Sequence, residues 1–332
     1  MHIVFFGAGA IGCHTGAAWL SSVVAAGGRI TLIGRPSRLS ALRDHALNLS
    51  GGPSVNIAPG ALHITDDPRI LFEADLIVLT HKAGALPDAI DAIRAHSAEK
   101  TPILSLLNGV APVRLLRQSL PERDCLAGMV PYNVVWQSST HLHRTGAGNI
   151  ALQRHPATEW LAAAGIEVDL HPDLTPIQYG KLLLNLANPI NALAGIPLCD
   201  MLLDRGYRLV LSAVIAEALN VYDQAGIGWT QVGPNNPRLA LRMLRAPTWL
   251  FRLVVLRKQR LDRSTMTSMA SDLQAGRLTE IDILSGEIAE VGQQHGIPTP
   301  INSALVRLVK SVETGDSVGP VASQRLLREV GL

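Results

Sequence analysis

A glycine-rich turn lies near the start of the chain, where Gly7-Ala-Gly9-Ala-Ile-Gly12 follows the apolar run 3–6 and precedes the apolar stretch 13–24. A short apolar run bounded by glycine is typical of a buried parallel strand. The six residues therefore present G-x-G-x-x-G in the strand–turn–helix context that a dinucleotide site needs, with the helix N-terminus facing the phosphates. A glycine turn without a ligand is the less favoured alternative. The residues assigned to the cofactor are Gly7, Ala8, Gly9, Ala10, Ile11 and Gly12.

The second predicted strand, residues 29–33, indicates which dinucleotide binds. In an NAD-binding chain an acidic residue is expected about 20 residues beyond the glycine motif, on the ribose 2′-hydroxyl. Here Arg35 follows the strand, Arg38 and Arg43 come next, and the first carboxylate is Asp44. A guanidinium suits a 2′-phosphate by charge and by its fork geometry. The sequence therefore predicts NADP(H), with Arg35 at the phosphate, whereas Arg43 is better interpreted as a solvated surface residue.

Two further buried strands, 74–80 and 102–107, are each followed by a polar residue. The carboxyl ends of strands in such sheets line the ligand crevice. Lys82 is therefore placed to meet the cofactor or a substrate carboxylate. Asn108 is placed near the nicotinamide, although simple turn chemistry of Asn-Gly explains it about as well.

An apolar helical segment, residues 181–191, contains one lysine and three asparagines, among them Lys181, Asn185 and Asn188. Their spacing of i, i+4 and i+7 puts them on one face of a helix, which Pro189 should kink. A lysine is rarely buried without a partner, and a buried amide must be hydrogen-bonded. A polar network that fixes the packing of two helices is the alternative. We favour a site in which the lysine releases a proton and the asparagines fix substrate oxygens.

A second polar block runs from Ser268 to Asp282. Either Thr279 or Asp282 could begin a helix that continues to Val291. Taken alone, these residues favour capping roles for Ser268 and for Thr279-Glu280.

The strand-like patterns stop near residue 173, and helical patterns follow to the end. Thr175 can cap the first of these helices, and Pro176 suits its first turn. A length of 332 residues is consistent with two domains. We expect a Rossmann-type domain over 1–173 and an all-α domain over 174–332, with a homodimer through the apolar helices of the latter.

Composition excludes several classes of protein. The net charge of +2 is too small to imply a nucleic-acid or membrane partner. The sequence contains no run of about 20 apolar residues, so no membrane span is predicted. The arginine-rich run 238–263 is interleaved with apolar residues, so a solvated amphipathic helix is favoured over RNA binding. The first residues run straight into a strand and predict no signal peptide. The widely spaced Cys13, Cys125 and Cys199 indicate a reduced, cytoplasmic compartment.

Together these landmarks resemble the ketopantoate reductase (2-dehydropantoate 2-reductase) family over nearly the whole chain. The most specific of them is Ser268-Met followed by Gly276-Arg-Leu-Thr-Glu-Ile-Asp282. The resemblance implies NADPH-dependent reduction of a small 2-oxo acid to a 2-hydroxy acid for pantothenate synthesis. It also implies a helical domain like the C-terminal one of 6-phosphogluconate dehydrogenase.

The resemblance further implies roles for single residues. Lys181 corresponds to the proton donor of the family. Substrate-holding positions correspond to Asn185, Asn188 and Ser268. Positions at the nucleotide or nicotinamide correspond to Lys82, Asn108 and Glu280, so that Glu280 becomes a site residue on family grounds.

Three positions depart from the family pattern. Two residues rather than the common three separate Asn185 from Asn188, Leu107 replaces a frequent glutamine, and Leu198 replaces a polar residue after Pro197. We expect these departures to cluster on the substrate side, where they put the identity of the oxo acid in doubt. Two alternatives stay open. One is a reductase of a different 2-oxo acid on the same scaffold, and the other is a catalytically silent NADP(H)-binding regulator.

Overall fold

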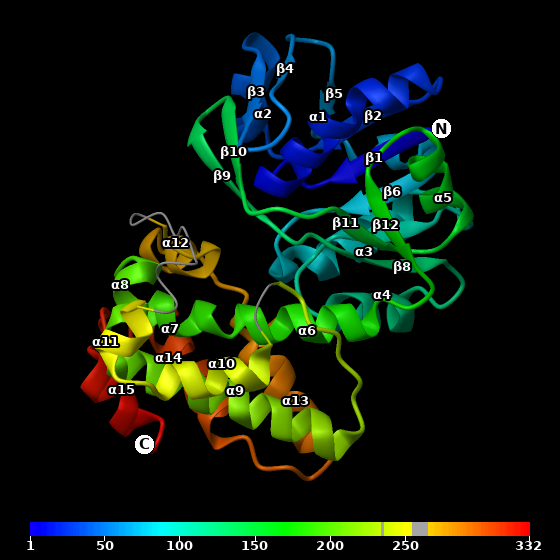
Figure 1. The fold of residues 1–332 in the computed structure, drawn as a ribbon. Helices are drawn as coiled ribbons and strands as arrows, with labels where there is room; N and C mark the ends of the chain where they lie inside the picture. Colours follow the sequence, from blue (N-terminus) through cyan, green and yellow to red (C-terminus); the bar gives the residue numbers. More distant parts are fainter. Residues whose placement is uncertain (234–235, 254–264) are drawn as a thin grey trace. The chain divides into compact units, whose positions relative to one another are not determined.

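The computed structural model describes residues 1–233, 236–253 and 265–332 (Figure 1). The chain divides into two compact units, Met1–Thr175 and Pro176–Leu332, called here the N-terminal and C-terminal units. Each has its own architecture.

The N-terminal unit is built on an eight-stranded sheet with the order β12-β11-β8-β7-β6-β1-β2-β5. The six strands from β8 to β5 all pair in parallel, and β11 runs antiparallel to β8. This arrangement confirms the predicted Rossmann-type α/β domain. The strands are β1 (His2–Phe6), β2 (Arg29–Ile33), β5 (His63–Thr65), β6 (Leu76–Leu79), β7 (Ile103–Ser105), β8 (Cys125–Met129), β11 (Ile150–Gln153) and β12 (Val168–His171).

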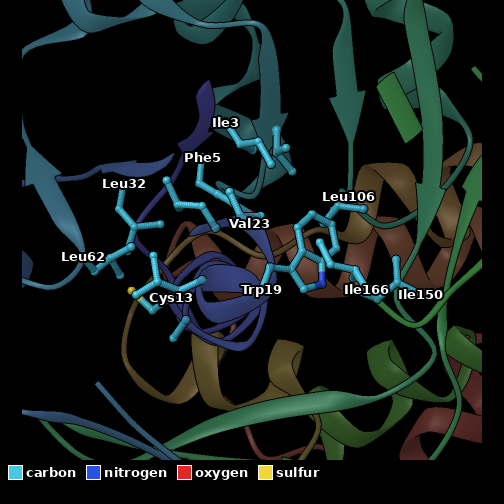
Figure 2. Close-up of a cluster of buried hydrophobic side chains, with 14 of the residues drawn as sticks. Ile3, Phe5, Cys13, Trp19, Val23, Leu32, Leu62, Leu106, Ile150 and Ile166 are labelled. Atoms are coloured by element: carbon cyan, nitrogen blue, oxygen red, sulfur yellow. The ribbon is translucent and has the colours of Figure 1, made fainter. Parts of the chain in front are cut away.

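Both faces of the central strand β1 are buried, as expected for a parallel sheet covered on two sides. Ile3 and Phe5 belong to one hydrophobic cluster, and Val4 between them belongs to the other. Figure 2 shows the first cluster, in which Trp19 of helix α1 meets Phe5 edge to face with ring centroids 5.6 Å apart. The helices of this unit are α1 (Ala10–Ala25), α2 (Pro36–Asp44), α3 (Leu86–His96), α4 (Ala111–Ser119) and α5 (Pro156–Ala163), with the 3₁₀ turns η1 (Pro68–Glu73) and η2 (Ala83–Ala85).

A second, four-stranded sheet in the same unit has the order β4-β3-β10-β9. Two of its strands, β3 and β4, lie in the connection between β2 and β6. Its members are β3 (Leu47–Ser50), β4 (Val55–Ile57), β9 (Asn133–Ser138) and β10 (His141–Thr145).

The described residues of the C-terminal unit form helices and turns, which confirms the predicted all-α architecture. The long helix α9 ends at Gly226, whose φ of +68° is the left-handed conformation that glycine adopts readily. The elements are α6 (Thr175–Asn185), α7 (Ala187–Ala194), α8 (Leu198–Leu203), α9 (Arg205–Ala225), α10 (Pro237–Arg245), α11 (Thr248–Phe251), α12 (Ser268–Gln274), η4 (Ile281–Ile283), α13 (Ser285–Gln294), α14 (Pro300–Glu313) and α15 (Ser323–Glu329).

The arginine-rich run 238–263 forms two short helices, α10 and α11, as far as it is described. Arg238 is exposed and pairs with Asp223 at 2.7 Å, which fits the expected solvated face. The remaining basic residues of the run, Arg257, Lys258, Arg260 and Arg263, lie outside the described residues. In the described part of the chain, no helix combines the length and the hydropathy needed to cross a membrane.

Arg208 of α9 is fully buried, and its guanidinium is fully hydrogen-bonded. It donates five hydrogen bonds, to four backbone carbonyls and the Thr248 hydroxyl, and these use all five of its N–H donors. It also lies over the Phe251 ring at 4.5 Å. The carbonyls lie in two pairs at the C-terminal ends of α8 and α10, so one cation caps both helices; they belong to Leu202, Leu203, Leu244 and Ala246.

Replacing Arg208 with methionine should therefore lower the free energy of unfolding by at least about 3 kcal/mol, because several buried acceptors lose their donors. Denaturant unfolding measures the change. The matched control is Arg238→Met, which removes an exposed ion pair and should cost no more than about 1 kcal/mol. Equal losses in the two variants would contradict the capping role of Arg208.

Candidate functional site

One edge of the large sheet collects the cofactor residues predicted in the N-terminal unit. Strands β1, β2, β6 and β7 are parallel neighbours, so their carboxyl ends lie at the same edge. The glycine turn follows β1, Arg35 follows β2, Lys82 follows β6 and Asn108 follows β7. Residues that lie far apart in the sequence, from Gly7 to Asn108, thus share one rim.

The first and third glycines of the turn are required by the protein itself. Gly7 has φ +130°, and a side chain there would collide with the backbone of Thr80 and His81. A side chain at Gly12 would collide with the Gly7 carbonyl and would lie 2.5 Å from the Thr80 hydroxyl. That hydroxyl donates to the Gly7 carbonyl at 2.8 Å, which joins the turn to the end of β6.

The second glycine is different. Gly9 is exposed, has φ −79°, and a Cβ there would lie 3.7 Å from the Thr80 carbonyl oxygen, an ordinary contact. The folded chain alone therefore has room for alanine at this position, and the close approach of a ligand is the remaining physical reason for glycine. Among the described residues, no side chain caps the N-terminus of α1, and its first turn is uncharged, so the helix end suits a pyrophosphate.

The neighbouring positions are consistent with a nucleotide on this rim. Arg35 is exposed and directly precedes α2, whose first turn begins Pro36-Ser-Arg. Lys82 directly precedes η2, and Asn108 lies before Gly109, whose φ of +82° forms a turn; both side chains are exposed. Ala8 is buried in the core, so only its backbone can face the cofactor.

Leu107 does not lie where the sequence suggested. Its side chain is 5% exposed and packs in the second hydrophobic cluster, beside residues such as Ile103 and Leu116. The expectation that it lies on the substrate side is therefore wrong, because the buried side chain packs in the core, whereas Asn108 is exposed.

In the C-terminal unit, Lys181 and Asn185 lie on α6 and Asn188 lies on α7, and all three are half-buried. The helix is interrupted at Leu186, and α7 then continues in nearly the same direction (Figure 1). Pro189 explains the interruption, since it has no N–H to donate to the Asn185 carbonyl. The single kinked helix that the sequence predicts is thus two helices. The predicted common face holds for Lys181 and Asn185, which both lie on α6.

Burial lowers the pKa of Lys181 below the usual lysine value of 10.5, because the apolar surroundings disfavour the ammonium. A lysine that releases its proton more easily is better matched to a role as general acid.

Ser268 is not a cap, contrary to the interpretation that the residues alone favoured. The N-cap of α12 is Thr267, whose hydroxyl accepts from the Ala270 N–H at 3.3 Å. Ser268 is the first residue of the helix and is exposed. Its hydroxyl is thus not used in capping this helix, which suits the family position to which it corresponds.

The turn that carries Glu280 also differs from the capping interpretation. The Thr279 hydroxyl accepts from the Ile281 N–H at 3.3 Å, but Glu280 makes no capping bond to the 3₁₀ turn η4. The following helix, α13, begins only at Ser285. The prediction that a helix begins at Thr279 or Asp282 and continues to Val291 is therefore wrong, and so is the capping role of Glu280. The Thr279 hydroxyl bonds the first N–H of η4.

Helix α14 bonds residues that precede and follow Glu280 in the sequence. The Thr279 N–H donates to Glu313 Oε1 at 2.7 Å, and Lys310 Nζ pairs with Asp282 Oδ1 at 2.6 Å. Glu313 and Lys310 lie one helical turn apart. Sequence reasoning missed both, because nothing near them in the chain indicates which loop they bind.

Comparisons with known proteins agree across both units. The model described as "Ketopantoate reductase PanE/ApbA" matches residues 3–157, and "Ketopantoate reductase PanE/ApbA C terminal" matches residues 173–313. The chain belongs to the ketopantoate reductase family. Its curated relatives named 2-dehydropantoate 2-reductase include one from Mesorhizobium japonicum, 27% identical over 95% of this chain and 99% of the relative. Another, from Pyrococcus horikoshii, is 26% identical over 95% and 98%.

Solved structures place this ketopantoate reductase family member on the same fold. A PanE/ApbA family ketopantoate reductase from Ralstonia eutropha superposes with a TM-score of 0.78, at 26% identity, over 95% of this chain and 99% of the other. A D-mandelate dehydrogenase with NADH and anilino(oxo)acetate superposes with a TM-score of 0.75 over 96% and 100%. It is 20% identical and so shows likeness of fold alone.

The contrast between the glycines gives a test of the cofactor turn. Gly9→Ala should change the free energy of unfolding by no more than about 1 kcal/mol, yet it should weaken NADPH binding because a methyl group occupies the ligand side. Gly12→Ala, the matched control, should cost about 1–3 kcal/mol or more in stability from overpacking. Denaturant unfolding and fluorescence titration with NADPH measure the two effects. Undiminished NADPH affinity in folded Gly9→Ala would remove the turn from the cofactor site.

Proposed function

We propose that the protein reduces 2-dehydropantoate (ketopantoate) to pantoate with NADPH, a step of pantothenate synthesis. The observation that carries the proposal is the desolvated Lys181, in a chain whose two halves both match the ketopantoate reductase family. Relatives named 2-dehydropantoate 2-reductase that align over nearly the whole chain support it.

NADPH, when bound, supplies the hydride for the C2 carbonyl carbon of the oxo acid. The Lys181 ammonium then stabilises the negative charge on the carbonyl oxygen and gives it a proton. Asn185, Asn188 and Ser268 orient the carboxylate and hydroxyl groups of the substrate, which contributes through positioning.

The residues that hold the cofactor in this proposal are those on the sheet rim, together with Glu280. The turn 7–12 binds the pyrophosphate through backbone N–H groups, and Arg35 pairs with the 2′-phosphate. Lys82, Asn108 and Glu280 bind the nucleotide or lie at the nicotinamide, as their family positions suggest. The uncapped start of α1 and the exposed Arg35 support this assignment.

A second candidate is reduction of a 2-oxo acid with an apolar side chain. It is favoured by Leu198, which is partly exposed at the first residue of α8. The similar fold of a D-mandelate dehydrogenase bound to anilino(oxo)acetate is consistent with it.

We also propose an assembly and a location for the protein. A homodimer through the helical unit is supported by three exposed apolar side chains, which belong to Leu239 of α10, Trp249 of α11 and Leu253 just beyond α11. A dimeric ketopantoate reductase from Staphylococcus aureus has the same fold, with a TM-score of 0.68.

The three cysteines are free and buried, which is consistent with the cytoplasmic location that we propose.

The decisive assay follows NADPH oxidation with ketopantoate for wild type, Lys181→Ala and the control Lys100→Ala, which changes an exposed lysine. We expect kcat to fall by about 10²–10⁴ in Lys181→Ala and to stay unchanged in the control. The wild-type kcat should be level at low pH and fall as pH rises through the pKa of Lys181, at an apparent pKa below 10.5.

The other outcomes separate the alternatives. Turnover on a panel of other 2-oxo acids but not on ketopantoate would favour the second candidate. NADPH binding without turnover of any oxo acid would indicate a silent regulator. Full activity in Lys181→Ala would refute the proton-donor role.

Cofactor choice is tested at the rim of the sheet. Arg35→Ala should raise KM for NADPH by about tenfold to a hundredfold, the loss of a charge-assisted hydrogen bond, and leave KM for NADH unchanged. The matched control is Arg43→Ala, in the last turn of α2, the helix that Arg35 directly precedes. This change should alter neither the KM for NADPH nor the KM for NADH. Equal effects of Arg35→Ala on both cofactors would show that this arginine does not read the 2′-phosphate.

A further inference from the structure

Asn191 lies on α7, one helical turn beyond Asn188, and is fully buried. Both ends of its amide are bonded: Oδ1 accepts from the Thr267 N–H at 3.0 Å, and Nδ2 donates to the Ile196 carbonyl at 2.8 Å. The side chain therefore has two fixed partners in two other segments of the C-terminal unit.

The two partners lie beside residues of the proposed site. Thr267 is the N-cap of α12, so the residue after it is Ser268. Ile196 lies in the turn between Gly195, which ends α7 in the left-handed conformation, and Leu198, which begins α8. One amide thus joins the helix of Asn188 to the start of α12 and to the turn that precedes Leu198.

Other contacts support the same junction. Helix α12 packs against α7 (Figure 1). The Leu198 N–H donates to the Thr265 carbonyl at 2.9 Å, which ties α8 to the segment that leads into α12. The three segments therefore meet around Asn191.

The chemistry of this position requires an amide. Thr267 offers a donor and Ile196 offers an acceptor, so the residue between them must accept at one atom and donate at another. A leucine would leave both backbone groups unsatisfied, and an ionised aspartate would repel the Ile196 carbonyl. Either change leaves a buried polar group without its partner.

A buried amide can also serve stability alone, and Asn302 in the same unit shows what that looks like. It is likewise fully buried, and its Nδ2 donates to Glu217 Oε1 at 2.9 Å, which joins α14 to α9. Its sequence neighbours and its partner are not proposed site residues. Asn302 is therefore a matched control for the loss of a buried amide.

We infer that Asn191 is a positioning residue for the oxo acid, which holds Ser268 in register with Asn188 by bonding the backbone that precedes Ser268. The inference rests on the proposed function, because that function assigns both residues to the substrate. It extends that function by a residue that itself contacts only other parts of the protein.

The test compares Asn191→Leu and Asn191→Asp with Asn302→Leu, by steady-state kinetics with ketopantoate and NADPH and by thermal unfolding. Both leucine variants should lower Tm. Only Asn191→Leu should raise KM for ketopantoate, by about tenfold to a hundredfold, with KM for NADPH unchanged, since a small displacement of a positioning group has effects of this size. Asn191→Asp keeps the acceptor for the Thr267 N–H and should recover part of the loss, and it serves as the folded variant if Asn191→Leu does not fold.

Two further readouts separate a positioning role from a structural one. In a Ser268→Ala background, the effect of Asn191→Leu on KM should shrink, because the residue through which it acts is gone. Hydrogen exchange of the Thr267 amide should speed up in Asn191→Leu and not in Asn302→Leu.

An active wild type with an unchanged KM for ketopantoate in folded Asn191 variants would overturn the inference while leaving the proposed function intact. A wild type that turns over no 2-oxo acid would overturn the proposed function, and the positioning inference would fall with it.

Discussion

The close approach of the glycine turn to the end of β6 is the constraint on which the N-terminal unit depends. Gly7 and Gly12 lie so near Thr80 that neither position has room for a side chain, and the Thr80 hydroxyl closes the contact with a hydrogen bond to the Gly7 carbonyl. The Gly7 N–H in turn donates to the Ile33 carbonyl at the end of β2. Three strand ends and the start of α1 are thereby fixed together. The rim that carries Arg35 and Lys82 inherits its geometry from this contact.

The C-terminal unit depends on a different device, polar side chains that bond the ends of helices distant in the sequence. Arg208 caps α8 and α10 from α9, Glu217 of α9 accepts from the Ile301 and Asn302 N–H groups at the start of α14, and Asn191 binds the start of α12. Helix ends leave unpaired backbone groups, and in a unit made of short helices these groups are many. Buried side chains that satisfy them also fix the register of one helix against another.

Local patterns predicted the features that depend on local physics. The strand–turn–helix context of the glycine motif and the all-helical second half can each be recognised from local patterns. Long-range partners could not be predicted, because Asn191 and Thr267 lie 76 residues apart and Thr279 and Glu313 lie 34 apart. The remaining errors concern adjacent residues whose side chains have different surroundings. A cap placed at Ser268 lies at Thr267, and Leu107, next to Asn108, has its side chain in the core.

The depressed pKa of Lys181 also has an evolutionary consequence. A lysine whose pKa is lower in the folded protein than in the unfolded chain destabilises the fold at every pH where it is charged, and this cost disappears only as pH rises through the usual lysine range. At neutral pH an apolar residue of similar length would make α6 more stable. Stability alone would therefore favour replacement of Lys181, and in the proposed function the proton that Lys181 supplies offsets this cost to the fold.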